Sequence, residues 1–296
     1  MPAGGEATQA QRSRFGICRI RSRACARVNR ASAAVARGRK ALDYVLMSTA
    51  SRAARAVSRR RTTPDGLWPS DGVIFDRTCT ECPRLAKYLA EGRKRHPGYY
   101  CAPVAPFGDA NARLIIVGLA PGFHGANATG RPFTGDYAGV ILYRTLHRFG
   151  FASRPESHSR DDGLQLIDCR ISNSVKCVPP QNKPTPAEIR TCSRYLTAEL
   201  TRLPADVVLF AMGSIAHTAG LRALGLKPSQ YKFAHAAEHR LPSGQTLIDS
   251  YHCSRYNTNT GRLTEAMFDA VFARARALVD ALPPRLPARR RAGDRR

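Results

Sequence analysis

The chain has 296 residues, of which 43% are hydrophobic, and its formal net charge is +25. This length allows one or two globular domains, and no run approaches the roughly 20 apolar residues that a membrane-spanning helix needs. Composition therefore excludes a helical membrane protein and favours a folded protein with a polyanionic partner.

The positive charge is concentrated at the two ends of the chain. Residues 1–61 hold fifteen Lys and Arg against Glu6 and Asp43, and residues 281–296 hold six Arg against Asp294. The amino-terminal segment is rich in Ala, Arg and Ser with few apolar anchors, so we expect residues 1–65 to form a basic, disordered extension. We expect a folded domain over residues 66–282 and an Arg-rich tail over 283–296. Both ends fit attraction to nucleic acid, and equally fit solvated segments without a specific role.

Apolar runs and capping signals predict an alternation of strands and helices in the middle of the chain. The predicted strands are Leu114–Val117, Leu166–Ile171, Val207–Met212 and Thr246–Ser250. The predicted helices are Gly139–Phe149, Ala187–Leu203, Ile215–Leu224 and Thr264–Leu282. Such alternation is typical of the α/β class, as a three-layer α/β/α sandwich with a central, mostly parallel sheet.

The loop that follows the first predicted strand, residues 118–136, is rich in glycine. It contains neither the GxxxxGK(S/T) phosphate loop nor a GxGxxG dinucleotide signature. Glycines allow the backbone to approach a ligand closely. The loop also offers an aromatic ring, a carboxylate, an imidazole and an amide, which together suit a pocket for a flat polar ring. These side chains are Phe133, Asp136, His124 and Asn127.

Two further polar segments follow the second and fourth predicted strands, at residues 173–180 and 252–257. Ligands of parallel α/β sheets bind at the carboxyl ends of the strands. We therefore expect the three segments to converge at one edge of the sheet.

Four of the nine cysteines form two pairs, Cys79 with Cys82 and Cys177 with Cys192. There is no amino-terminal apolar signal segment, so we expect a reducing, cytoplasmic compartment in which disulfides are rare. Four thiolates suit a tetrahedral zinc ion or a [4Fe–4S] cluster, and spacing does not choose between them. Buried free cysteines are the alternative.

Taken together, these segments resemble the iron–sulfur uracil-DNA glycosylases. The resemblance covers residues 70–275 and rests on GLAPGFHGANATGRPFTGD, SNSVKCVPPQNKPTP and SYHCSRYNTNTGRLT in this order, with the four cysteines. The long first loop is more similar to family 5, also called type b, because family 4 has a glutamate where this chain has Leu119. The resemblance implies the α/β/α fold, a [4Fe–4S] cluster, and removal of uracil, and of deaminated purines such as hypoxanthine, from DNA.

The resemblance also implies roles for three catalytic side chains. A glycosylase must flip the base out of the helix and stabilise the charges that develop as the glycosidic bond breaks. Asp136 would orient water or support the cationic sugar, although it could simply cap the following helix. His252 would donate a hydrogen bond to the departing base, and Asn173 would recognise its polar edge.

Further residues would bind the base and the DNA. Phe133 would stack on the flipped base. The expected base-binding residues besides Phe133 are Gly118, Ala120, His124 and Asn127. The expected DNA-binding residues are Ser254, Arg255 and Asn257, with Lys176 and Lys183 as additional charges on the DNA side.

Two positions depart from the family pattern, and two alternative functions remain open. Cys253 replaces the usual proline of a His-Pro-Ser turn, which puts the rigidity of that loop in doubt, and Ala128 stands where arginine is common. The alternatives are a family 4 type enzyme restricted to uracil, and a non-catalytic metal-cluster protein that binds nucleic acid. We expect a monomer that acts on DNA in the bacterial cytoplasm.

Overall fold

The computed structural model describes residues 75–109 and 111–283. The expected extension over residues 1–65 lies outside the described residues, as do residues 284–296 of the expected tail. The strands are β1 (Phe107–Gly108), β2 (Leu114–Gly118), β3 (Cys169–Asn173), β4 (Val208–Met212), β5 (Glu238–Arg240) and β6 (Thr246–Ser250). The helices are α2 (Pro83–Arg95), α3 (Ala126–Thr129), α4 (Tyr137–Arg148), α5 (Pro186–Leu200), α6 (Ser214–Ala223), α7 (Arg255–Asn259) and α8 (Glu265–Asp280).

The strands form one six-stranded sheet in the order β1-β3-β2-β4-β6-β5. The inner strands β3, β2, β4 and β6 are parallel, and the short edge strands β1 and β5 are antiparallel to their neighbours. Every residue of β2, β3 and β4 is buried, as expected for parallel strands that are covered on both faces. The predicted α/β class with a mostly parallel sheet is confirmed.

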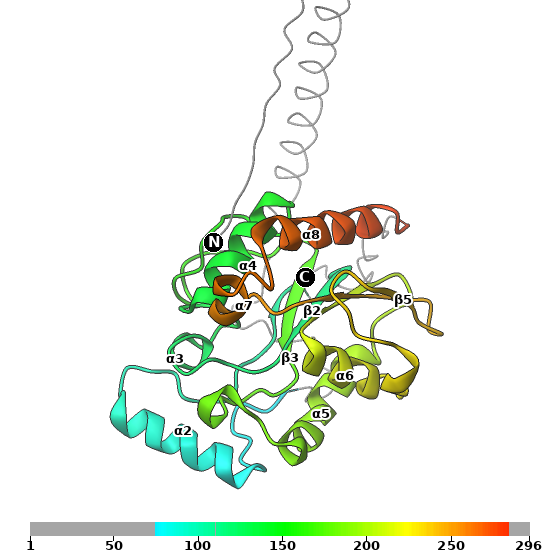
Figure 1. Cartoon of the computed structure of the whole chain (residues 1–296). Helices are drawn as coiled ribbons and strands as arrows, with labels where there is room; N and C mark the ends of the chain where they lie inside the picture. The colour runs from blue at the N-terminus through cyan, green and yellow to red at the C-terminus, as the bar shows by residue number, and fades with distance from the viewer. Residues whose placement is uncertain (1–74, 110, 284–296) are drawn as a thin grey trace, which may run out of the picture. The chain divides into compact units, whose positions relative to one another are not determined.

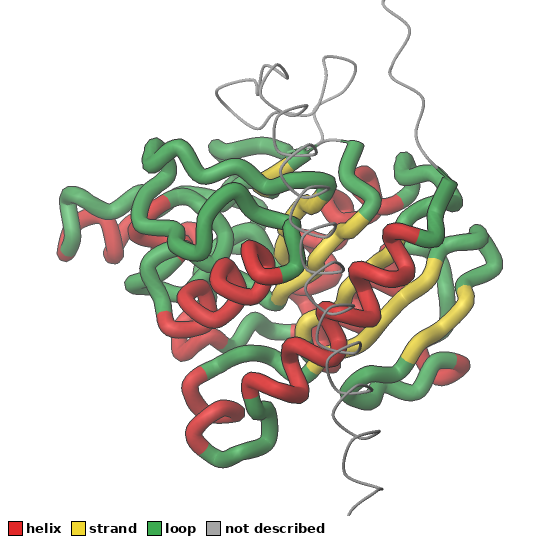
Figure 2. The backbone as a smooth tube through the Cα atoms, turned by 90° about the horizontal axis from the view of Figure 1, so that it is seen from above, coloured by secondary structure: helices red, strands yellow, loops and turns green. Residues whose placement is uncertain are grey.

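Two helical layers cover the sheet, and Figures 1 and 2 show strands lying between helices. On one face, Leu142 of α4 and Phe272 of α8 belong to a core cluster with Phe210 of β4. On the other face, Leu196 of α5 and Ala216 of α6 belong to a second core cluster, with alternate strand residues. This arrangement is the predicted three-layer sandwich. None of the helices within the described ranges is long and apolar enough to cross a membrane.

Local capping explains where the long helices begin. Thr185 and Glu188 form a reciprocal capping box at the start of α5, with Pro186 in the first turn. Thr264 caps α8 by accepting a hydrogen bond from the Met267 amide. The predicted helices lie within a few residues of the observed ones because these signals are local.

Three features differ from the sequence-based expectation. The second predicted strand, Leu166–Ile171, begins too early: Leu166 pairs with Ala152 in an isolated bridge, and Asp168, at a φ of 52°, interrupts the extended backbone before β3. Helix α2 was not predicted, although Pro83 at its first position and three basic residues in its last turn are helix signals. The edge strands β1 and β5 are too short to leave an apolar pattern.

Candidate active site

The carboxyl ends of β2 and β3 lie side by side, and Gly118 pairs in register with Asn173. A Cβ atom placed on Gly118 would lie 2.5 Å from Asn173 Oδ1 and 2.9 Å from the Phe133 ring. The strand end is held by Ser174, whose amide and hydroxyl both donate to the Gly118 carbonyl at 2.9 Å. Gly118 is therefore required because no side chain fits between its backbone and these two groups.

Asn173 presents an unpaired acceptor in this crowded place. Its side chain is 3% exposed, and Oδ1 has no hydrogen-bond partner among the described residues. A buried polar atom without a partner costs free energy, so such an atom points to a ligand that supplies the missing donor.

Phe133 has a strained backbone and a ring that faces the histidine loop. Its φ is 53°, a left-handed conformation that is uncommon for residues other than glycine. The ring is 7% exposed and lies nearly parallel to that of His252, with 5.9 Å between centroids and an interplanar angle of 29°. Gly118, Phe133, Asn173 and His252 thus converge as the strand order predicted.

His252 follows β6 and is partly buried. Burial lowers the pKa of its imidazole to about 4, so the ring is neutral at physiological pH. The backbone of this loop is fixed by the Asn257 amide group, which donates from Nδ2 to the His252 carbonyl at 2.8 Å. A neutral imidazole can still donate one hydrogen bond to an acceptor placed beside it.

The two carboxylate oxygens of Asp136 have different surroundings. Oδ1 accepts from the Gly139 amide at 2.9 Å and caps α4. Oδ2 lies against the glycine loop: a Cβ on Gly125 would be 2.3 Å from it, and a Cβ on Gly122 would be 3.2 Å from it. Burial raises the pKa of Asp136, while hydrogen bonds from the Gly139 and Ala138 amides act in the opposite direction.

The remaining expected base-binding residues occupy different surroundings. Asn127 is fully buried and donates from Nδ2 to the Phe123 carbonyl at 3.3 Å, so it supports the loop from inside. His124 is exposed, with Nδ1 2.9 Å from the Tyr99 hydroxyl. Ala120 packs against the cluster of residues that surrounds the four cysteines. These contacts of Asn127, His124 and Ala120 are not with Phe133, Asn173 or His252.

The segment after His252 is a short helix with an exposed tyrosine. Ser254 caps α7 by accepting a hydrogen bond on its hydroxyl from the backbone amide of Asn257. Ser254 and Asn257 therefore both hold the loop after His252 in place. Arg255 is exposed, and its guanidinium lies 5.1 Å from the Tyr137 ring centroid. Tyr256 is 72% exposed and was not singled out from the sequence, although an aromatic residue in a polar segment close to His252 is a usable signal.

Cys253 is anchored more firmly than its departure from the family pattern implied. Its side chain is fully buried, and the thiol lies 3.4 Å from the Ala138 carbonyl oxygen and 3.5 Å from Met212 Sδ. Core contacts thus hold the loop where the family uses a proline.

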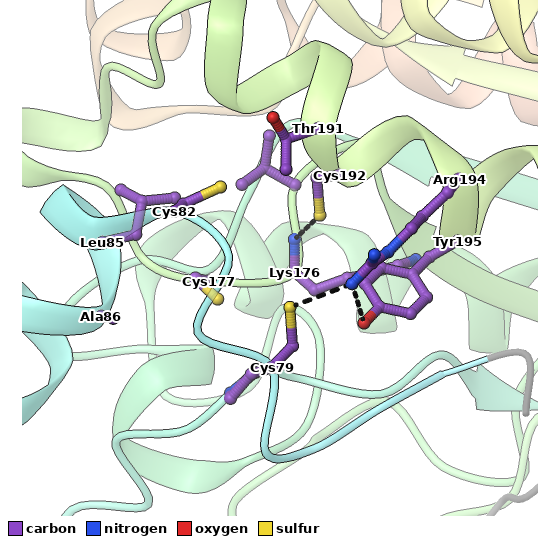
Figure 3. A pocket seen from close by; sticks show the side chains of 12 residues that line it. Cys79, Cys82, Leu85, Ala86, Lys176, Cys177, Thr191, Cys192, Arg194 and Tyr195 are labelled. Carbon is purple, nitrogen blue, oxygen red and sulfur yellow. Dashed lines mark hydrogen bonds between the residues drawn. The ribbon is translucent and has the colours of Figure 1, made fainter.

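The four cysteines that form the two sequence pairs are free thiols, and they line one small cavity between the start of α2, the loop after β3 and helix α5. Figure 3 shows the sulfurs of Cys79, Cys82, Cys177 and Cys192 pointing toward a common space. The Lys176 amide lies 3.3 Å from Cys192 Sγ, and Arg194 Nη2 lies 3.4 Å from Cys79 Sγ. Four convergent sulfurs with polar hydrogens near two of them are a suitable donor set for a thiolate-ligated metal centre.

The prediction that Lys176 faces DNA is wrong. Its side chain is 1% exposed, and its ammonium donates to Ser172 Oγ at 2.6 Å and lies 3.7 Å from Glu199 Oε2. Arg170 completes this buried charge network by donating to Glu199 Oε1 at 2.8 Å. Lys183, in contrast, is exposed.

His217, His239 and Asp249 form a second group of side chains that could hold a metal ion. The group is already paired internally, because His217 Nδ1 lies 2.8 Å from Asp249 Oδ1 and His239 Nε2 lies 3.3 Å from Asp249 Oδ2. His217 Nε2 also lies 2.9 Å from the Tyr231 carbonyl oxygen. This arrangement braces β6 shortly before His252.

Comparison with known proteins identifies the family. A profile of the uracil DNA glycosylase superfamily matches residues 105–276. The chain is 48% identical over 205 residues to a type-5 uracil-DNA glycosylase of Thermus thermophilus, covering 68% of this chain and 93% of that protein. It is 40% identical over 219 residues to a type-5 enzyme of Pyrobaculum aerophilum, covering 73% and 95%.

Similarity to type-4 enzymes is more limited. The type-4 uracil-DNA glycosylase of Thermotoga maritima is 36% identical over 110 residues, covering 37% of this chain and 49% of that protein. The type-5 matches have the greater coverage and identity, and they decide between the two branches. The chain belongs to the uracil-DNA glycosylase superfamily, within its type-5 branch.

Proposed function

We propose that this chain is a DNA repair enzyme that removes uracil from DNA by hydrolysing its N-glycosidic bond, leaving an abasic site. The observation that carries this proposal is the meeting of Asn173 and Phe133 at Gly118, with His252 beside the Phe133 ring and an unpaired acceptor on Asn173. An aromatic ring next to an unpaired buried amide oxygen suits a flat ring that carries an N–H group.

Recognition of the base would depend on Asn173 and Phe133. The Asn173 Oδ1 atom would accept a hydrogen bond from the imide N–H of uracil, and the amide Nδ2 would donate to a ring carbonyl. Phe133 would stack on the flipped base. The attachment of Asn173 to the end of β3 and the fixed turn around Phe133 would hold both residues ready before the base arrives.

Bond cleavage would depend on His252 and Asp136. As the glycosidic bond breaks, negative charge develops on the departing base and positive charge on the sugar. The neutral His252 ring would donate a hydrogen bond to the base oxygen that gains charge. Asp136 would use Oδ2 to orient the attacking water or to support the cationic sugar, while Oδ1 continues to cap α4.

Contacts with the DNA would come from the segment after His252. Arg255 is exposed beside the Tyr137 ring and would bind a phosphate. Ser254 and Asn257 would act by supporting this helix. The exposed Tyr256 would occupy the space that the flipped base leaves in the helix, because an aromatic ring replaces lost base stacking. The basic ends over residues 1–65 and 283–296 would add nonspecific attraction to DNA.

We also propose that Cys79, Cys82, Cys177 and Cys192 hold a [4Fe–4S] cluster, with zinc as the less favoured occupant. The donor set of four convergent sulfurs fits either centre, and membership of the type-5 branch favours the cluster. Its role would be structural, because it would join α2 and α5 to the loop that begins at Asn173.

The range of bases and the biological setting are part of this proposal. We propose that deaminated purines such as hypoxanthine are also substrates, and that the enzyme works as a monomer in the bacterial cytoplasm. A family 4 type enzyme would act on uracil alone, and a non-catalytic binding protein would act on neither base.

The test is an alkaline-cleavage assay on matched duplexes that carry uracil or hypoxanthine opposite a normal base. We expect the unaltered protein to cleave both, and His252→Ala and Asn173→Ala to lose cleavage while they still bind DNA. His158→Ala is the matched control, because the His158 imidazole is exposed and, among the described residues, pairs only with Glu156, while its backbone amide is kept in the variant. Binding without cleavage by the unaltered protein would refute an enzymatic function.

A further inference from the structure

The turn that carries Phe133 is held by contacts outside the pocket. A left-handed φ at a non-glycine residue costs free energy and persists only where the surroundings enforce it. On one side, the Tyr143 hydroxyl donates to the Pro132 carbonyl at 2.8 Å. On the other, Thr134 Oγ1 lies 2.7 Å from Ser157 Oγ. The strained residue is therefore fixed at both neighbours.

Arg131 is the strongest of these anchors. Its side chain is 3% exposed, and Nη1 donates to Asp162 Oδ1 at 2.8 Å. Nη2 donates to the Arg160 carbonyl at 2.6 Å, and the guanidinium lies 4.5 Å from the Phe107 ring centroid. A planar guanidinium that meets a carboxylate, a carbonyl and a ring at once has a single orientation.

Asp162, the partner of Arg131, organises the loop in which it lies. Its carboxylate accepts hydrogen bonds from the backbone amides of His158, Ser159 and Leu164, so one side chain shapes the loop between residues 157 and 164. Burial alone would raise the pKa of Asp162, but these hydrogen bonds and Arg131 outweigh it and lower the pKa to about 2. The carboxylate is thus charged over the whole physiological range of pH.

We propose that Arg131 and Asp162 form a positioning pair that holds Phe133 in its strained conformation and thereby fixes the ring against Gly118 and His252. The inference rests on the proposed function, because it is the base-stacking role of Phe133 that gives this position its importance. Arg131 is a positioning residue: its contacts lie with the loop around Asp162, and it acts through the Phe133 backbone two residues away.

The experiment measures single-turnover excision of uracil by Arg131→Lys and Asp162→Asn, each alone and combined with Phe133→Ala. We expect each single change to lower the excision rate about tenfold while affinity for abasic-site DNA stays within about twofold. In the Phe133→Ala background the same changes should add less than about twofold, because the ring they position is gone. Equal losses in both backgrounds would overturn the inference, as would the absence of any loss.

Arg113→Lys is the matched control. Arg113 pairs with Asp168 at 2.6 Å in a partly buried arginine–aspartate ion pair directly before β2, at the opposite end of the strand from Gly118. We expect its excision rate to match that of the unaltered protein. A loss equal to that of Arg131→Lys would indicate general destabilisation and would refute a positioning role.

A second readout does not depend on activity. With p-fluorophenylalanine at position 133, the ¹⁹F resonance should shift or broaden in Arg131→Lys and stay unchanged in Arg113→Lys. If the unaltered protein excised no uracil, the proposed function would fail while this spectrum still decided whether the pair positions the ring. An unchanged resonance in Arg131→Lys would overturn the inference.

Discussion

Gly125→Ala tests whether the position of the Asp136 carboxylate matters for catalysis. A Cβ at Gly125 would lie 2.3 Å from Asp136 Oδ2 and 2.8 Å from its Cγ. Ordinary contact begins at 3.4 Å, so the carboxylate must retreat by about 1 Å. A displacement of this size at a catalytic group costs about 100-fold in rate. We expect uracil excision to fall by this factor.

The stability of the variant should change much less than its rate. If the displaced carboxylate also lost its bond to the Gly139 amide, the missing helix cap would cost about 1 kcal/mol, or roughly 2–4 °C in melting temperature. Gly220→Ala is the matched control, because a Cβ there has no atom within 4 Å and α6 gains a better helix former. Single-turnover cleavage and thermal unfolding measure both effects. A Gly125→Ala rate within about threefold of the control would refute the catalytic importance assigned to the Asp136 position.

Three more predictions follow from the site. His252 should titrate near pH 4 in an NMR experiment, with its resonance assigned by comparison with His252→Gln. Because folding lowers the pKa of His252, the free energy of unfolding should decrease as pH falls from 6.5 toward 4, and it should decrease less in His252→Gln. A titration midpoint near 6.5 would contradict this prediction. Cys177→Ala should lose the brown colour and about four iron atoms per chain, and should unfold at a lower temperature, because alanine offers no ligand atom. Cys101→Ala, at a buried cysteine outside the four, should keep its iron, and full iron in Cys177→Ala would exclude Cys177 as a ligand. Tyr256→Ala should weaken binding to abasic-site duplex by 1–3 kcal/mol, or roughly 5–150-fold, in a fluorescence titration, and unchanged affinity would show that the ring does not enter the DNA.

The parts of the fold that depend on local signals could be predicted from the sequence. The apolar run at Leu114–Val117 is buried on both faces, and only a covered parallel strand requires that pattern. The Thr185–Glu188 capping box marks the start of α5 by itself. The meeting of Gly118, Asn173 and His252 followed from the rule that parallel strands end at the same edge.

The parts that depend on contacts between distant segments could not be predicted. Lys176 is a charged residue in a polar segment, and nothing near it in the chain shows that Glu199 and Arg170 meet it inside the protein. Helix α2 contributes only two buried leucines, Leu85 and Leu89, and packs in the apolar cluster around the cysteines. Burial and pairing of this kind are properties of the assembled fold.

Asp136 shows why its two possible roles could not be separated by sequence alone. Capping the helix and serving the pocket were alternatives when only the order of residues was known. In the structure Oδ1 caps α4, and Oδ2 lies against the glycine loop, where it would be available for the proposed catalytic role. Replacing Asp136 with alanine therefore removes both functions at once. Gly125→Ala moves the carboxylate without deleting it, so its rate, read beside its melting temperature, tests the proposed catalytic role separately from loss of the cap.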